Sequence, residues 1–345
     1  MKKRALILGG TGAMGTFLVE ILNKTDKWDI IVTSRREHES QYINVKYIKG
    51  NAKEEKFLRK LCMNNKFDAI IDFMNYGYDE FRERVLNLVN ATEHYVFLSS
   101  SRVYDYSNEQ ITENNNRLLD TTKDQEFLNT QRYALRKARQ EDILKSLKNK
   151  NWTIIRPYIT YSNLRLQLGI YEKEQWLYRL LNNKKLIIRK DILDKKTSLT
   201  YGYDVAYGIS KILCNEAAYG ESIHIVTEET MKWRDILNLY LDVIEENLGK
   251  RAIVYESNNI EKIEELFEGG YNTKYDRLWD RSFNNQKAEK ICGKINYVGM
   301  KYGLNKCLTE FINKWKKEGN DIFLDVIPEF EKYMDEKLKE IDDYQ

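Results

Sequence analysis

GGTGAMG, residues 9–15, is a glycine-rich stretch between the apolar run ALIL (5–8) and the amphipathic stretch MGTFLVEILNK (14–24). The apolar run predicts a β-strand, and the amphipathic stretch predicts a helix. Glycines at every third position of such a loop allow a tight turn. They also let the backbone approach a pyrophosphate, whose charge then lies at the helix N-terminus. The loop therefore indicates a dinucleotide site, although a tight strand-to-helix turn without a ligand would show the same glycines. The residues expected to bind the dinucleotide here are Gly9, Thr11, Gly12, Met14 and Gly15.

Short apolar runs alternate with stretches of helical spacing through the first half of the chain. Strands that are apolar throughout need cover on both faces, and this alternation predicts parallel strands joined by crossover helices. We therefore expect a Rossmann-type, doubly wound α/β fold, with an NAD(P)-binding domain over residues 1–165 and a return segment near 200–230. Residues 166–345 are expected to form mainly a smaller α/β substrate-binding region with C-terminal helices. The apolar runs lie at 5–9, 29–34, 45–48, 68–73, 94–100 and 152–157.

Charge and composition exclude several kinds of partner. The 56 Lys and Arg side chains nearly balance the 53 Asp and Glu, which leaves +3, and no basic stripe stands out. We therefore expect no nucleic-acid partner. No run approaches the ~20 apolar residues that cross a bilayer, so we expect a cytoplasmic protein without a membrane partner. The cysteines lie far apart without CxxC spacing and the histidines are isolated, so the sequence predicts no metal site.

The second apolar run ends in VTSRRE, residues 32–37, at the place where a dinucleotide-binding fold contacts the adenosine ribose. An acidic residue here favours NAD, whereas a nearby arginine accommodates the 2′-phosphate of NADP. The small hydroxyl of Ser34 and the guanidinium groups of Arg35 and Arg36, which are charged, bidentate donors, suit a phosphate, so we expect these three residues to bind the cofactor. We therefore expect NADP to be favoured over NAD, unless the two arginines only cover a solvated helix end. Asn51, after the third strand, is expected near the adenine.

Tyr133 and Lys137 lie four residues apart in the stretch 125–149, whose spacing predicts a helix, so they share one helix face. A lysine ammonium one turn from a tyrosine favours the phenolate. The tyrosine can then exchange a proton with a substrate hydroxyl while hydride moves to the cofactor. The strand at 94–100 runs into three serines, 99–101, at its carboxyl end, where a parallel sheet opens toward its ligand. A serine hydroxyl there could hold the reacting oxygen, although serines at strand ends are often turn formers.

Taken together, these motifs resemble the extended short-chain dehydrogenase/reductase family, the NAD(P)-dependent nucleotide-sugar epimerases and dehydratases. The resemblance implies a catalytic triad of Ser100, Tyr133 and Lys137, with Ser100 chosen because it lies three residues before the Val of a VY pair, Val103. We also expect Lys137 to contact the nicotinamide ribose. The matching motifs, within about residues 4–245, are GGTGAMG, FLSSSRVYDYSNEQITE, YALRK, IIRPYITYS and YGYDVAYGISKIL.

The residues that follow the expected catalytic serine limit which reactions of this family we expect. Members of this family that eliminate water carry an acidic pair there, whereas this chain has Ser101 and Arg102, which argues against a dehydratase. We expect a nucleotide-sugar epimerase or a 4-keto reductase, and NADP would tilt this slightly toward a reductase. The alternative is a non-catalytic NADP-binding sensor of the atypical short-chain reductase type, which usually lacks a YxxxK pair. The resemblance also implies a homodimer packed through the helix that carries YALRK.

A nucleotide-sugar substrate would need cationic or aromatic groups in the second region. Trp176 and Trp279 could stack on a base, but core packing is the commoner role of tryptophan. Each candidate cation is more often a solvated surface charge. These candidates are Arg165, Arg189, Lys190 and Arg277.

Overall fold

The computed structural model describes residues 1–63 and 65–343 and is built around a seven-stranded sheet. All neighbouring strands run parallel, in the order β13-β6-β5-β4-β1-β2-β3. The order along the sheet reverses between β1 and β4, which is the mark of a doubly wound sheet, so the predicted Rossmann-type fold is confirmed. The strands are β1 (Lys3–Leu8), β2 (Trp28–Ser34), β3 (Val45–Lys49), β4 (Phe67–Asp72), β5 (Thr92–Leu98), β6 (Trp152–Arg156) and β13 (Glu221–His224).

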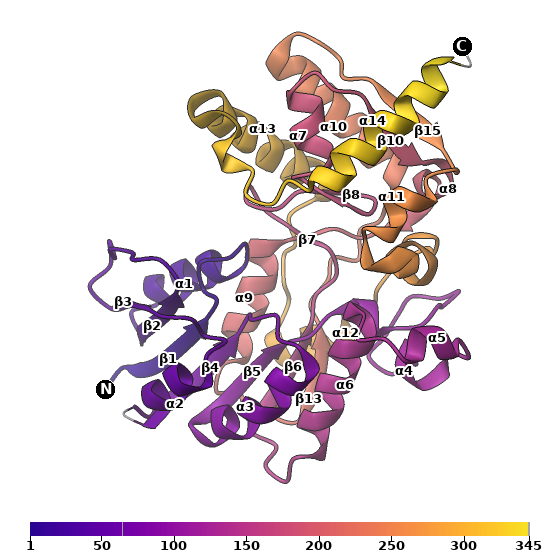
Figure 1. Ribbon diagram of the computed structural model, residues 1–345. Coiled ribbons are helices and arrows are strands. Elements are labelled where there is room, and N and C mark those ends of the chain that lie inside the picture. Colours follow the sequence, from indigo (N-terminus) through magenta and orange to yellow (C-terminus); the bar gives the residue numbers. More distant parts are fainter. Residues whose placement is uncertain (64, 344–345) are drawn as a thin grey trace.

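Helices cover both faces of this sheet (Figure 1). Successive side chains of a strand point to opposite faces, and over residues 5–8 of β1 both sets are apolar and fully buried. Ala5 and Ile7 join one core and Leu6 and Leu8 join the other, so each face needs its own layer of helices. One layer consists of α1 (Gly15–Lys24), α9 (Gly202–Ile212) and α12 (Gln286–Cys292), and the other of α2 (Glu55–Met63), α3 (Tyr78–Asn90) and α6 (Tyr133–Ser146).

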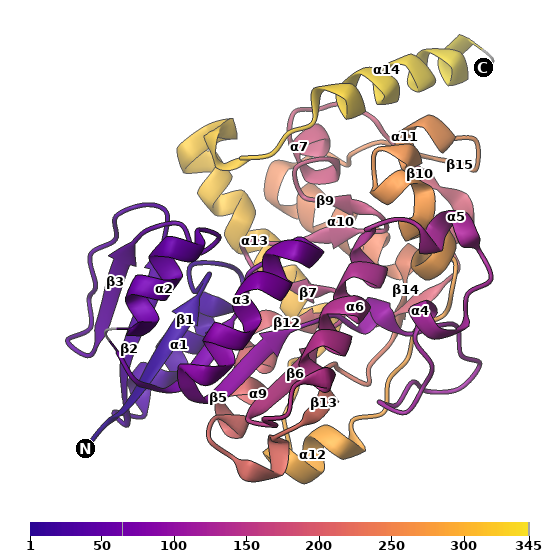
Figure 2. The ribbon, with the colours of Figure 1, turned by 60° about the horizontal axis from the view of Figure 1, so that its bottom comes forward.

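A second region packs at one end of the sheet, and both views place the C-terminus on its far side (Figures 1 and 2). It has its own apolar core, in which Trp176 stacks on Tyr240 with ring centroids 4.6 Å apart, so this tryptophan is a core residue.

The remaining helices and strands are short or belong to the second region. The shorter helices α4 (Leu118–Thr121) and α5 (Gln125–Leu128) precede α6 in the first region. The second region contains β7 (Thr160–Tyr161), β8 (Gln167–Leu168), β9 (Tyr171–Glu172), α7 (Trp176–Leu181), β10 (Leu186–Arg189), α8 (Lys190–Leu193), β11 (Lys196–Thr197), β12 (Thr200–Tyr201), β14 (Met231–Lys232), α10 (Trp233–Leu248), β15 (Val254–Ser257), α11 (Glu261–Glu265), α13 (Met300–Glu318) and α14 (Pro328–Asp343).

Segments from the second half of the chain return to the sheet. β13 pairs with β6 at one edge of the sheet, and α12 packs against α9 in one of the two helix layers. The boundary at residue 165 itself stays a prediction. Within the described residues, no helix combines the length and apolar character needed to cross a membrane. The same part of the chain contains no group of three or more His, Cys, Asp or Glu side chains that could hold a metal ion.

The helix predicted over residues 125–149 is interrupted, so the prediction of one continuous helical stretch is wrong at residues 129–132. Asp124 caps α5 by accepting a hydrogen bond from Phe127 N at 2.9 Å. Thr130 Oγ1 then donates to Phe127 O at 2.7 Å, which satisfies a carbonyl at the end of that helix. Because the helix restarts after this turn, Tyr133 becomes the first residue of α6.

A buried ion pair attaches α6 to the ends of two strands. Glu141 Oε1 accepts from Arg156 Nε at 2.8 Å and from Ser99 Oγ at 2.6 Å, and Glu141 Oε2 accepts from Arg156 Nη2 at 2.6 Å. Glu141 and Arg156 are at most 2% exposed. Burial by itself raises the pKa of Glu141, but the Arg156 charge and these hydrogen bonds outweigh it and hold the pKa below its ordinary value.

Replacing Glu141 with alanine would leave the Arg156 guanidinium buried without its carboxylate. We expect Glu141→Ala to lower the free energy of unfolding at pH 7 by about 3–5 kcal/mol, measured by urea denaturation. Asp142→Ala is the matched control, because Asp142 lies on the same helix but is half exposed in its ion pair with Arg117. That control should cost no more than about 1 kcal/mol. Equal losses in the two variants would contradict the role given to Glu141.

The same pair predicts a pH dependence. A carboxyl whose pKa is lower in the folded than in the unfolded chain stabilises the fold fully above its unfolded pKa, about 4.3 for glutamate. This contribution is lost as the pH falls through the folded-state pKa. The stability difference between the wild type and Glu141→Ala should therefore be constant at neutral pH and shrink below about pH 4.

Candidate functional site

The glycine loop joins the carboxyl end of β1 to the start of α1. Gly9 has a φ of +73°, a conformation that favours glycine. A Cβ on Gly10 would lie 2.7 Å from Val32 Cγ1, and a Cβ on Gly15 would lie 2.5 Å from Gly10 Cα, so neither position has room for a side chain. A Cβ on Gly12 would meet only the Gly9 carbonyl, at 3.5 Å, which leaves that side of the loop open. The first turn of α1 contains no acidic residue, so the loop fits a pyrophosphate at the helix N-terminus.

The loop lies where the strand order reverses, which is the crevice where ligands bind in open α/β sheets. Phe73 N, just after β4, donates to Leu8 O at 3.0 Å, so the ends of β1 and β4 remain together. Thr11 and Met14 are half-buried within the same loop. The residues expected to bind a dinucleotide therefore lie together at one edge of the sheet.

The end of β2 leaves two guanidinium groups unengaged. Ser34 is buried, and its Oγ accepts a hydrogen bond from Arg36 N at 3.1 Å in a turn. Arg35 and Arg36 are exposed, and neither side chain has a partner among the described residues. By contrast, Asn51 Oδ1 accepts from Lys53 N at 3.0 Å in the turn before α2, so this side chain already has a local role. Its contact with adenine stays a prediction.

The three serines after β5 differ in what their hydroxyl groups contact. Ser99 Oγ donates to Glu141, and Ser101 Oγ donates to Arg156 O at 2.7 Å, so both act within the protein. Ser100 caps the short helix η1 (Ser101–Val103), and its Oγ accepts from Arg102 N at 3.2 Å. The structure provides no acceptor for the Ser100 hydroxyl hydrogen among the described residues. Of the three, Ser100 is therefore the serine whose hydroxyl is left to donate to a ligand.

Tyr133 and Lys137 approach the same strand end from α6. The Tyr133 backbone N donates to Glu268 Oε2 at 2.8 Å, which caps the start of the helix. Lys137 is only 3% exposed, and its Nζ donates to Leu98 O, the last residue of β5, at 2.8 Å. The same Nζ lies 5.9 Å from the centroid of the Tyr133 ring. The three residues expected to form the triad are thus placed at the end of β5.

Two buried groups near this strand end have strongly shifted pKa values. Burial lowers the pKa of Lys137 to about 8, although the nearby Asp72 carboxylate opposes this change. Burial also raises the pKa of Asp72 to about 6, against hydrogen bonds from Tyr95 OH at 2.8 Å and Met74 N at 3.0 Å. Asp72 was not among the predicted residues, although an acidic residue at the carboxyl end of an apolar strand, as in FDAIID (67–72), is a usable signal.

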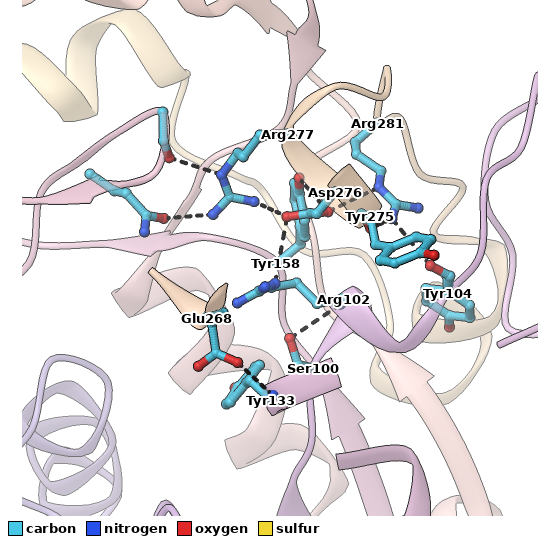
Figure 3. A network of polar contacts seen from close by, with 12 residues as sticks. Ser100, Arg102, Tyr104, Tyr133, Tyr158, Glu268, Tyr275, Asp276, Arg277 and Arg281 are labelled. Carbon is cyan, nitrogen blue, oxygen red and sulfur yellow. Dashed lines mark hydrogen bonds and ion pairs between the residues drawn. The ribbon is translucent and has the colours of Figure 1, made fainter. Parts of the chain in front are cut away.

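A cluster of buried arginines surrounds one carboxylate next to Ser100 and Tyr133 (Figure 3). Asp276, from the one-turn helix η4 (Thr273–Arg277), accepts at Oδ1 from Tyr158 OH and from Arg281 Nε, each at 3.1 Å. Asp276 Oδ2 is paired with Arg277 Nη1 and lies 3.6 Å from Arg102 Nε. Three guanidinium groups therefore share one carboxylate.

The four cations proposed for a nucleotide diphosphate are placed differently from one another. Arg165 and Arg189 form ion pairs with acidic neighbours, each at 2.7 Å, and Lys190 is exposed. For Arg277 the expectation of a surface charge is wrong, because this residue is only 2% exposed. Its Nε donates to Gly169 O at 2.8 Å, and this carbonyl, together with the Asp276 carboxylate, compensates the buried charge.

Solved structures resemble this chain over nearly its whole length. The protein Pal from Bacillus thuringiensis has a TM-score of 0.68 at 20% identity, over 90% of this chain and 99% of that chain. UDP-glucuronic acid 4-epimerase from Bacillus cereus, in complex with UDP-glucuronic acid and NAD, has a TM-score of 0.66 at 16% identity, over 90% and 99%. dTDP-glucose 4,6-dehydratase from Bacillus anthracis, in complex with NAD, has a TM-score of 0.65 at 16% identity, over 92% and 98%. At these identities the likeness shows the fold alone.

The family follows from the sequence match. No curated protein matches the chain. The sequence profile of the NAD dependent epimerase/dehydratase family matches residues 5–226, well over half of the chain. This range includes the glycine loop, the serines after β5, the start of α6 and the last strand of the sheet. The resemblance indicated by the motifs is confirmed: the chain belongs to the NAD dependent epimerase/dehydratase family.

Proposed function

We propose that this protein is an NAD(P)-dependent nucleotide-sugar epimerase or 4-keto reductase that acts by tyrosine-assisted hydride transfer. The observation that carries this proposal is the convergence of three groups at the end of β5. Tyr133 begins α6, Lys137 lies buried one turn later, and Ser100 keeps a hydroxyl hydrogen free to donate. A non-catalytic sensor has no need of this arrangement, so it favours an enzyme.

The proposed roles follow from these positions. A bound nicotinamide would supply or accept the hydride at the reacting carbon. Ser100 would donate its free hydrogen bond to the substrate oxygen on that carbon, and Tyr133 would exchange the proton of the same oxygen. The Lys137 ammonium, whose Nζ lies 5.9 Å from the Tyr133 ring centroid, would keep a positive charge beside the tyrosine during this exchange.

The residue after Ser101 supports an epimerase or reductase over a dehydratase. Elimination of water needs an acid and a base at neighbouring carbons, and family members that catalyse it carry an acidic pair after the catalytic serine or threonine. Here the second of these positions is Arg102, whose guanidinium lies 5.3 Å from the Tyr133 ring centroid. A guanidinium remains protonated and cannot act as this acid or base at neutral pH.

We also propose that NADP is preferred, although the family description and the solved relatives name NAD. The exposed Arg35 and Arg36 support this, because their guanidinium groups have no other partner among the described residues and a 2′-phosphate would supply one. We further propose a cytoplasmic homodimer packed through α6, on which Arg136, Arg139 and Ile143 are half-buried and Asp142, Lys145 and Ser146 are exposed.

Tyr133→Phe removes the phenol oxygen and keeps the ring. We expect this variant to bind the dinucleotide with unchanged affinity and to lose at least about 10²–10⁴-fold in kcat, because proton exchange with the substrate would be lost. The measurement is steady-state turnover of nucleotide sugars with NADPH or NADH, alongside titration of the cofactor. Tyr106→Phe is the control, since Tyr106 is half exposed and bonds only within its own loop. Full turnover in Tyr133→Phe would defeat the mechanism.

Arg35→Ala tests the cofactor preference. We expect the wild type to bind NADPH more tightly than NADH in a fluorescence titration that follows energy transfer from tryptophan. The substitution should raise the Kd for NADPH by about tenfold or more and that for NADH by less than about twofold, because only NADPH has a 2′-phosphate. Arg59→Ala, an exposed arginine on α2, should change neither. Tighter binding of NADH by the wild type would overturn the preference.

A further inference from the structure

Arg102 lies beside the groups proposed to handle the reacting oxygen. It follows Ser100 by two residues, and its backbone N donates to Ser100 Oγ. Its guanidinium lies 5.3 Å from the centroid of the Tyr133 ring, and its side chain is 17% exposed. Figure 3 shows the guanidinium directed toward the space between Asp276 and Glu268, next to Tyr133. A substrate oxygen that reaches Ser100 and Tyr133 therefore comes close to this cation.

Among the three clustered arginines, Arg102 has the weakest set of partners. Arg277 donates to Gly169 O at 2.8 Å and Gln167 Oε1 at 3.3 Å. Arg281 donates to Tyr104 O at 3.1 Å, among other acceptors. The Arg102 side chain makes no hydrogen bond to any described residue, and its Nε is buried without one. Its contact with Asp276 Oδ2, at 3.6 Å, is an ion pair beyond hydrogen-bond distance.

Charges of both signs surround the three arginines Arg102, Arg277 and Arg281. Glu172 acts on Arg277, Asp105 acts on Arg281, and the further cation Arg165 acts on Arg102. The carboxylates beside Arg102 are Asp276 and Glu268. Both carboxylates have other donors: Tyr158 OH bonds Asp276, and the Tyr133 backbone N bonds Glu268. Burial lowers the pKa of Arg102 and takes that of Arg277 to about 10, which is the effect of charged groups removed from water. The Arg102 guanidinium is largely buried and makes no hydrogen bond, so a ligand that supplies an acceptor would stabilise it.

We propose that Arg102 binds a carboxylate on the sugar ring of the substrate, so that the enzyme acts on a nucleotide-linked uronic acid. This inference rests on the proposed function and specifies its substrate class. A hexuronic acid carries its carboxylate on the carbon next to the one that bears the 4-hydroxyl. The diphosphate is attached to the carbon on the opposite side of the ring. A cation beside Ser100 and Tyr133 is therefore placed for the ring carboxylate rather than for the diphosphate. Guanidinium and carboxylate groups pair through two parallel hydrogen bonds, and the Arg102 side chain has these donors unused.

The test compares ligands that differ only at this substituent. Calorimetry measures the binding of UDP-glucuronic acid, UDP-glucose and UDP to the whole protein preloaded with dinucleotide. The pair glucuronic acid 1-phosphate and glucose 1-phosphate is measured in the same way, because this pair tests the carboxylate without assuming which nucleotide the substrate carries. We expect the carboxylate-bearing member of a pair to bind at least about tenfold more tightly. Arg102→Gln should reduce this ratio to within about twofold, and Arg102→Lys should keep part of it.

Arg59→Gln is the matched control. It removes the same charge from an exposed arginine on α2, outside the site, and should leave the ratio unchanged. A thermal melt of each variant checks that the fold is retained, and the Arg102→Lys result keeps the test decisive if Arg102→Gln is unstable. The proposal is overturned if neither pair shows a preference for the carboxylate, or if Arg102→Gln weakens UDP as much as UDP-glucuronic acid, because the guanidinium would then bind the diphosphate.

The two proposals can fail separately. If Tyr133-dependent turnover occurs on neutral nucleotide sugars and the binding ratio is absent, the proposed function stands and the uronic acid is wrong. If the Arg102-dependent ratio is present but no hydride moves, the binding inference stands and the catalytic function is wrong.

Discussion

The contact between Glu141 and Arg156 fixes the geometry on which the candidate site depends. Glu141 belongs to α6, Arg156 ends β6, and Ser99 follows β5, so one buried carboxylate joins the helix of Tyr133 to two strand ends. A buried ion pair adds little net stability compared with an apolar contact of similar shape. Each buried carboxylate oxygen must nevertheless accept hydrogen bonds, because an unpaired buried oxygen would be destabilising. We therefore interpret the ion pair as the contact that holds Tyr133 and Lys137 against the end of β5.

The reversal of strand order supplies the second constraint. Because the order reverses between β1 and β4, the glycine loop after β1 opens beside the end of β4, where Asp72 lies. The next strand, β5, ends in the serines, so cofactor loop and candidate catalytic groups share one edge of the sheet. The second region meets this edge through Glu268, which caps α6, and Asp276, which gathers three arginines. Arg102 lies between the end of β5 and the second region, and its side chain makes no hydrogen bond to any described residue.

The parts that could be predicted from the sequence are those set by local patterns. Apolar runs and glycine spacing predicted the sheet and the loop, because both depend on neighbouring residues. The break before Tyr133 was not predicted, since the spacing over 125–149 predicts one helix through 129–132, whereas α5 ends in a turn in which both Thr130 N and Thr130 Oγ1 donate to Phe127 O. The burial of Arg277 was missed for a similar reason: its compensating partners include Gly169, more than 100 residues away. The family motif pointed to Ser100, but only the structure shows that its two neighbours are already engaged.

Following the hydrogen at C4 of the substrate is the most direct test of hydride transfer. A panel of C4-deuterated nucleotide sugars, with UDP-glucuronic acid and UDP-glucose among them, would be incubated with the protein and oxidised NADP or NAD. The products would be examined by mass spectrometry, which locates the deuterium, and by NMR, which distinguishes the two configurations at C4. Hydride transfer predicts that deuterium from at least one sugar appears in the dinucleotide or returns to C4 in the opposite configuration. Loss of deuterium to water, or recovery of every sugar unchanged with both dinucleotides, would contradict hydride transfer at this site.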